Sequence, residues 1–201
     1  MRVREALRQQ DGHGLSRHRI ARLMHKAGIR SVHKPKFVVA TQSQHAYPVP
    51  RNILDRDFLP GAINQRIVTD ITSIATQEGW LYLAAVMDLG SRRIIGWSMK
   101  PTMDVEFIIC ALNMARTNRP QLIGALHHSD HGSQYACDAY RRCLGMMKMQ
   151  PSMSRTGCCW DNAAMESFFH PLKVECVHRQ RYATRDEARI SIFEYIEGFY
   201  N

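Results

Sequence analysis

The pattern of hydrophobic and polar positions changes at residue 66. Beyond that point, three short runs rich in β-branched and aromatic residues cover 66–74, 80–89 and 92–99 and are joined by brief turns. Such runs predict an antiparallel three-stranded meander. Residues 104–117 instead repeat apolar residues at helical spacing, which predicts one buried stripe of Phe107, Ile108, Ala111, Leu112 and Ala115.

Strands and helices alternate in the rest of the chain. We expect a strand at 122–130, a helix at 133–145, a strand at 147–153 and a helix at 161–177, before a last helix that Thr184 caps. Three antiparallel strands, followed by strands that return through helices, give a mixed five-stranded sheet with helices on its faces. The predicted fold class is therefore α/β with the ribonuclease H-like order of elements.

A short basic helix is predicted near the start of the chain, at residues 16–28. Ser16 can cap it and Gly28 can end it. One apolar stripe is surrounded by basic side chains, which fits the second half of a helix-turn-helix that binds DNA. The candidate DNA contacts of this helix are Arg17, Arg19, Arg22 and Lys26.

A polar, basic segment with four prolines follows, and it predicts a linker at residues 31–65. The expected organisation is a partial helix-turn-helix at 1–30, this linker, and a catalytic core at 66–201. The charge agrees with that division. Residues 1–51 carry eleven Lys and Arg against two acids, whereas the other 150 residues carry sixteen of each sign. All of the net charge of +9 therefore lies in the first quarter, which favours a polyanion partner over a merely solvated basic tail.

Several classes of protein are disfavoured by the composition. The sequence lacks the roughly 18 consecutive apolar residues of a membrane helix and the apolar core of a secretory signal, so we expect a cytoplasmic protein without a membrane partner. The six cysteines are read as reduced thiols rather than disulfides. A zinc site formed by Cys158, Cys159, Cys176 and His178 is disfavoured, because adjacent cysteines do not match the usual ligand spacing.

Three acidic residues occupy positions that suit a metal site. Asp70 interrupts an apolar strand, Asp130 ends a strand before a glycine turn, and Glu166 lies early in a helix, with Lys173 two turns further along. Divalent metals such as Mg²⁺ prefer oxygen ligands, and paired ions about 3.5–4 Å apart promote phosphodiester chemistry. One such acid alone would be a surface or capping residue, but three together favour metal binding. We interpret Asp88, Asp104 and Asp161 as structural, the last two as helix N-caps.

Several long motifs of the sequence resemble those of one protein family. The runs TDIT, EGWLYLA, HSDHGSQY, SMSRTGCCWDNA and ESFF resemble the second-frame transposases of the insertion-sequence-three family, which are relatives of retroviral integrases. The resemblance covers about residues 66–201, and HRIARLMHKAGIR and NILDRDF extend it upstream. It implies that Asp70, Asp130 and Glu166 form the catalytic acidic triad, with 35 residues between the last two.

The same resemblance implies the rest of the chemistry. Two Mg²⁺ (or Mn²⁺) ions would promote cleavage of the transposon ends and strand transfer into target DNA. Lys173 would contact DNA near the cut end. The protein would assemble as a homo-oligomer on DNA. Both ends of the chain are expected to be truncated relative to the family. The paired Cys158 and Cys159 replace a different run in many relatives and are read as packing residues. The alternatives left open are an inactive DNA-binding remnant of a transposase and, less favoured, a nuclease of the same fold.

Overall fold

The computed structural model describes residues 16–29 and 45–201. The chain divides into two compact units, 1–38 and 39–201. The first contains helix α2 (Arg17–Lys26), where the Ser16 side chain accepts a hydrogen bond from the Arg19 amide and Gly28 adopts the left-handed conformation just past the end. The predicted helix and both of its ends are confirmed. The first half of the expected helix-turn-helix lies outside the described residues.

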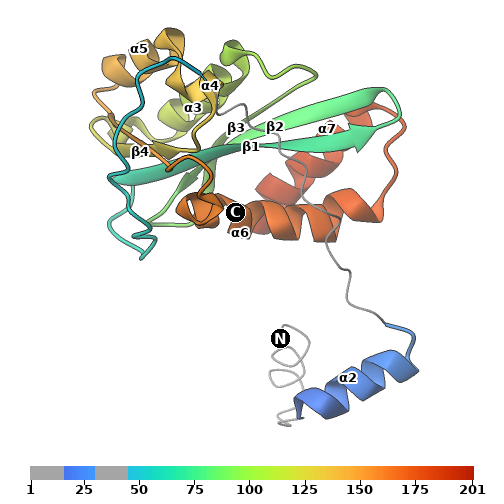
Figure 1. Ribbon diagram of the computed structural model, residues 1–201. Helices are drawn as coiled ribbons and strands as arrows, with labels where there is room; N and C mark the ends of the chain where they lie inside the picture. The colour runs from blue at the N-terminus through green and yellow to red at the C-terminus, as the bar shows by residue number, and fades with distance from the viewer. Residues whose placement is uncertain (1–15, 30–44) are drawn as a thin grey trace. The chain divides into compact units, whose positions relative to one another are not determined.

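A five-stranded mixed sheet forms the centre of the second unit (Figure 1). The strand order is β3-β2-β1-β4-β5, in which the first three strands are antiparallel neighbours and β4 and β5 run parallel to β1. This is the predicted sheet. Its strands are β1 (Arg66–Thr76), β2 (Gly79–Asp88), β3 (Ile94–Lys100), β4 (Leu126–Ser129) and β5 (Gln150–Met153).

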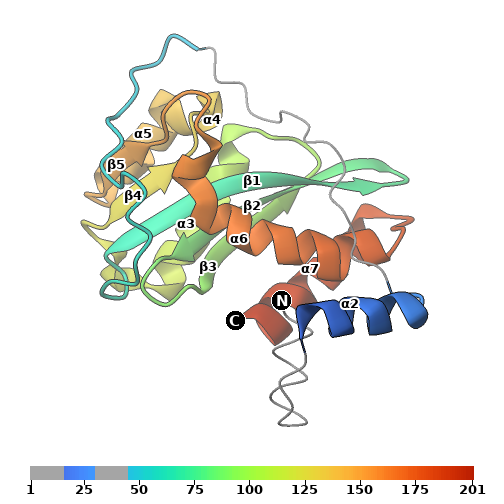
Figure 2. The ribbon, with the colours of Figure 1, turned by 60° about the horizontal axis from the view of Figure 1, so that its bottom comes forward.

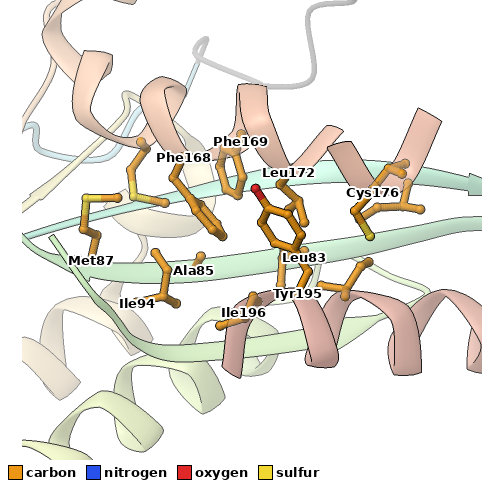
Figure 3. Close-up of a cluster of buried hydrophobic side chains, with 14 of the residues drawn as sticks. Leu83, Ala85, Met87, Ile94, Phe168, Phe169, Leu172, Cys176, Tyr195 and Ile196 are labelled. Atoms are coloured by element: carbon orange, nitrogen blue, oxygen red, sulfur yellow. The ribbon is translucent and has the colours of Figure 1, made fainter. Parts of the chain in front are cut away.

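Helices cover both faces of this sheet, and each face has its own apolar core (Figures 1 and 2). On one face lie α3 (Val105–Asn118), α4 (Ser133–Ala136) and α5 (Asp138–Met146), against residues such as Ile67 and Val86. On the other lie α6 (Ala163–Pro171) and α7 (Arg185–Phe193). Figure 3 shows this second core, in which Phe168 and Leu172 pack over Leu83 and Ala85 of β2.

Several predicted elements differ from those observed: β5 starts at Gln150 rather than at residue 147, and the last helix continues after α7 as a π-helix at Glu194–Tyr200. The expected strand at 122–130 shrinks to β4, since Pro120–Leu122 form a 3₁₀ turn and Gly124 has a left-handed φ of +83°. The helix at 133–145 is two helices, because Cys137 is extended between them. The helix at 161–177 widens into a π-helix at Leu172–Cys176 after Pro171, whose ring removes a hydrogen-bond donor and crowds the preceding turn.

Part of the predicted linker packs on the sheet domain. Leu54 is buried among the residues of the α6 and α7 core, and Phe58 packs against the same cluster. The amides of Ile53 and Leu54 donate to the Ser152 hydroxyl of β5, at 2.9 and 3.2 Å. This segment therefore belongs to the same compact unit as the sheet, while the boundary expected at residues 65 and 66 stays a prediction.

Among the helices of 16–29 and 45–201, none combines the length and the apolar character that a membrane span requires.

Candidate active site

Two neighbouring parallel strands position the first two candidate acids. Strands β1 and β4 are parallel neighbours, and Val68 of β1 pairs with His128 of β4. Asp70 and Asp130 each come two residues after a member of this pair. Asp70 is largely buried in the middle of β1, and Asp130 comes directly after the last residue of β4. Parallel neighbours carry their side chains in step, which explains why residues 60 positions apart in the sequence come to one place.

Helix α6 carries the third acid. Glu166 lies in its first turn and is exposed, while Ala164, Met165 and Phe168 of the same helix are buried against the sheet. Asn162, the residue at the start of α6, donates to the backbone oxygen of Thr69 at 3.4 Å. This contact ties the start of the helix to the residue next to Asp70.

Electrostatics link the candidate residues to one another. Burial raises the pKa of Asp70 well above its usual range, and the negative charges of Asp130 and Glu166 raise it further. The Ile71 amide, which donates to Asp70 Oδ1 at 2.8 Å, and the positive charge of Lys173 act in the opposite direction. The Asp130 carboxylate accepts the Gly132 amide at 3.1 Å. Asp130, Glu166 and Lys173 therefore all lie within electrostatic range of Asp70.

The donor set fits a hard cation in its chemistry, because it consists of carboxylate oxygens that repel one another. Its geometry is open, however. Within the described parts of the chain, no three His, Cys, Asp or Glu side chains gather closely enough to hold a metal ion. Cys158 and Cys176 are free thiols, and the side chain of Cys159 lies outside the described residues.

A buried tyrosine supports the strand that carries Asp70. Thr69 donates its hydroxyl hydrogen to the Ala85 backbone oxygen, so the Tyr135 hydroxyl 3.3 Å away is the donor to Thr69. Burial raises the pKa of Tyr135 well above its usual range, and the charges of Asp130 and Asp70 contribute. The sequence analysis did not single out this residue, because an isolated tyrosine early in a helix resembles any core aromatic.

One structural acid has a different role from the one predicted. Asp161 does not cap α6, whose N-cap is Asn162 without a side-chain cap. Its carboxylate is instead fully buried and paired with Arg155 and Arg56, and side-chain hydrogen bonds, with Arg155 first, hold the pKa of Asp161 far below its usual range. The other two interpretations are confirmed. Asp104 caps α3 through the Phe107 amide, and Asp88 accepts the Ser91 amide in the turn after β2.

The basic residues expected to contact DNA are in two places. Arg19, Arg22 and Lys26 are exposed on α2, and the side chain of Arg17 lies outside the described residues. Lys173 is partly buried in the π-helical turn that follows α6. The first set belongs to the unit 1–38 and Lys173 to the unit 39–201.

Comparison with known proteins then identifies the family. The family model described as "Integrase core domain" matches residues 61–159, and a second model of the same description matches 166–201. The transposase InsF for insertion sequence IS3A of Escherichia coli (strain K12) is 41% identical over 200 residues, which is 100% of this chain and 69% of that protein. The insertion element IS600 uncharacterized 31 kDa protein of Shigella sonnei is 45% identical over 193 residues, 96% of this chain and 71% of that protein.

Solved structures agree on the fold. A simian T-cell lymphotropic virus intasome, in complex with PP2A regulatory subunit B56 gamma, contains a chain with a TM-score of 0.57 and 17% identity, covering 98% of this chain and 65% of that one. The catalytic domain of Mos1 mariner transposase also gives a TM-score of 0.57, at 13% identity, covering 66% of this chain and 70% of that one. The sheet domain thus has the ribonuclease H-like fold of integrase and transposase catalytic cores, as predicted. With 41% identity over its full length and an integrase core domain, the chain belongs to the insertion-sequence-three (IS3) family of DNA transposases.

Proposed function

We propose that this chain cuts and joins DNA strands by using Asp70, Asp130 and Glu166 as the ligands of two divalent ions, Mg²⁺ or Mn²⁺. The observation that supports this most is geometric: Asp70 lies in β1, Asp130 directly follows β4, its parallel neighbour, and the charges of Asp130 and Glu166 both act on Asp70. Three carboxylates within range of one another are unfavourable without a cation. Because the described side chains do not yet form a closed set of ligands, we expect binding to draw the exposed Glu166 inward.

Each part of the chain has a distinct role in this proposal. The ions would supply activation of the attacking oxygen and neutralisation of charge on the phosphate. Asp70 and Asp130 would bind the ions from neighbouring strands, with their carboxylates oriented by the amides of Ile71 and Gly132. Lys173 would bind a phosphate of the DNA end, since a lysine is a compact positive charge on a flexible stem.

DNA is the proposed partner of both units. Exposed Arg19, Arg22 and Lys26, together with Arg17, would contact the backbone of the transposon end from helix α2. We propose that the protein acts in the bacterial cytoplasm as a homo-oligomer that brings two transposon ends to a target duplex. The fold shared with an intasome chain supports assembly on DNA.

A nicking assay tests the catalytic part of the proposal. Purified protein with Mn²⁺ and a labelled duplex that carries the transposon end should release a product nicked at the 3′ end of the transposon. Asp130→Ala should lower the rate by roughly 100-fold or more, because the charge stabilisation from a bound metal is worth several kcal/mol. Asp138→Ala is the matched control, since Asp138 is an exposed acid of α5 outside the site, and it should nick like the unmodified protein.

The same assay separates the alternative function. An inactive DNA-binding remnant would bind the duplex but show no nicking that depends on Mn²⁺ and on Asp130. Equal nicking by the unmodified protein and by Asp130→Ala would show that the cutting comes from elsewhere and would end the catalytic proposal.

A further inference from the structure

A buried polar network lies beside the candidate active site. We call it the Asp161 network, and it joins the segment before β1, strands β4 and β5, and the loop that precedes α6. Its members are Asn52, Arg56, His128, Ser152, Arg155 and Asp161.

The carboxylate of Asp161 is the centre of the network. Its side chain has no exposed surface, and five N–H donors point to its two oxygens. Arg155 contributes its amide, Nε and Nη2 at 2.9–3.0 Å, Arg56 its Nε at 2.7 Å, and Asn52 its Nδ2 at 3.0 Å. A carboxylate offers about four lone-pair sites, so this one is saturated. A buried charge that is so completely compensated fixes the relative positions of the groups around it.

His128 forms the second arm of the network. Its Nε2 lies 3.0 Å from the Asp161 backbone oxygen, which can only accept, so Nε2 carries the hydrogen and Nδ1 accepts from the Ser152 hydroxyl at 2.8 Å. The Ser152 oxygen in turn accepts the amides of Ile53 and Leu54. The chain of hydrogen bonds therefore returns to the segment from which Asn52 and Arg56 reach Asp161.

The backbone of that segment is strained where it meets the network. Asp55 and Arg56 are consecutive non-glycine residues with φ of 40° and 65°, in the left-handed region that side chains disfavour. The Asp55 amide donates to Asn52 Oδ1 at 2.9 Å, which closes the turn. Strain of this kind persists only where surrounding contacts hold it, and here it aims the Arg56 guanidinium at Asp161.

The Asp161 network lies close in sequence or through hydrogen bonds to all three candidate acids. His128 precedes Asp130 by two residues on β4, and Asp161 precedes Glu166 by five residues at the start of the α6 region. Asn162, next to Asp161, bonds to the Thr69 oxygen beside Asp70. The contacts thus connect the strand end that carries one acid to the helix start that carries another.

We propose that Asp161 and Arg56 are positioning residues for the metal site, and that residues 52–56 act as a clamp that holds the Glu166 helix in register with Asp130. This inference rests on the proposed function of the triad. Arg56 donates its Nε hydrogen to Asp161 Oδ1 at 2.7 Å. It acts through Asp161, so its loss should affect the assembly of the metal site rather than the binding of DNA.

The test uses Arg56→Ala, because Arg56 is 46% exposed and its truncation leaves the apolar cores intact. Arg141→Ala is the matched control. That arginine is 44% exposed and pairs with Asp138 on the surface of α5, away from the network. In the nicking assay, Arg56→Ala should lower kcat and raise the Mn²⁺ concentration for half-maximal rate by roughly 10- to 100-fold, as outer partners of metal ligands do. Its KM for DNA should stay within about twofold of the unmodified value, since phosphate contacts are unchanged.

A second measurement keeps the inference independent of catalysis. Amide hydrogen exchange of residues 155–169 should speed up in Arg56→Ala and in Asp161→Asn, but not in Arg141→Ala, when all variants are folded. If the unmodified protein shows no Mn²⁺-dependent nicking, the proposed function fails and exchange alone decides the positioning role. Unchanged exchange in Arg56→Ala, or a loss of kcat no greater than that of Arg141→Ala, overturns the clamp.

Discussion

At the scale of single residues, two adjacent histidines of β4 set the acid sensitivity of the fold. His127 and His128 are buried, the first bonded to Tyr140 and the second inside the Asp161 network. Burial lowers the pKa of His127 to about 3 and that of His128 to about 4. Both are therefore neutral in the folded protein, whereas histidine in an unfolded chain titrates near 6.5.

The expected consequence is a loss of stability below pH 6.5. Between that pH and about 4 the two histidines bind two more protons in the unfolded chain than in the folded one, so they make the free energy of unfolding fall as pH falls, while the raised pKa of Asp70 acts in the opposite direction. The limiting slope is about 1.4 kcal/mol per pH unit for each histidine. Chemical denaturation from pH 7 to 4 measures it. In His127→Gln the slope should become less steep by up to about 1.4 kcal/mol per pH unit, because the contribution of one histidine is lost, and an unchanged slope would contradict the assignment. The depressed pKa of Asp161 adds its loss only below about pH 4, outside this window.

At the scale of elements, strand β3 and helix α3 approach each other through a single glycine. A Cβ atom added at Gly96 would lie within 3 Å of the Ala111 carbonyl oxygen and of the backbone nitrogen and Cβ of Ala115. Two of these three atoms belong to the backbone of α3, which can give way only if the helix itself moves. The small residues Ala111 and Ala115 on the predicted apolar stripe of α3 are thus the surface that receives β3.

We expect Gly96→Ala to force α3 away from the sheet and to lower the free energy of unfolding by about 1–3 kcal/mol or more. Gly145→Ala is the control. Gly145 lies within α5 with nothing within 4 Å of an added Cβ, so this change should raise stability by about 0.5–1 kcal/mol. Urea titration measures whether the free energy of unfolding falls in the first variant and rises in the second. A Gly96→Ala protein as stable as the unmodified one would show that β3 and α3 are not in close contact at this residue.

At the scale of the whole molecule, the excess positive charge and the three candidate acids lie in different parts of the sequence. The first 51 residues carry the entire net charge of +9, while residues 52–201, which include the three acids, have no net charge. Phosphate contacts release counterions, so DNA affinity should fall steeply with salt, with a slope of about 0.9 in log affinity against log salt for each contact. This attraction resides mainly in the unit that contains α2.

Arg22→Ala should therefore weaken DNA binding and reduce the magnitude of that slope by about 0.9. Arg141→Ala removes the same charge from the surface of α5 and should leave the slope unchanged. Fluorescence anisotropy with a labelled transposon-end duplex between about 50 and 200 mM salt covers the sensitive range. Equal slopes for all three proteins would show that α2 does not contact phosphate.

The sequence predicted the ends of helices well where the signal, such as a capping residue and its partner, lies within a few consecutive residues. Thr184 and Glu187 form the capping box that starts α7, and Asp104 caps α3, because a cap needs only the next three residues. The same reasoning failed at Asp161. An aspartate before a helix is suited to capping, but an aspartate that accepts distant arginines has the same local sequence. Local signals also missed the break at Cys137, where the chain remains extended between α4 and α5.

The alternation of strands and helices, the charge asymmetry and, through long motifs, the family and its three candidate acids could all be derived from the sequence. Which side chains meet depends on the fold. Asp70 and Asp130 come into range because β1 and β4 are parallel neighbours, and Arg56 reaches Asp161 across 105 residues of sequence. Hydrophobic periodicity depends on each residue's own burial, so it can be read along the chain. The partner of a buried charge depends on how separate elements pack, and no short stretch of sequence contains that information.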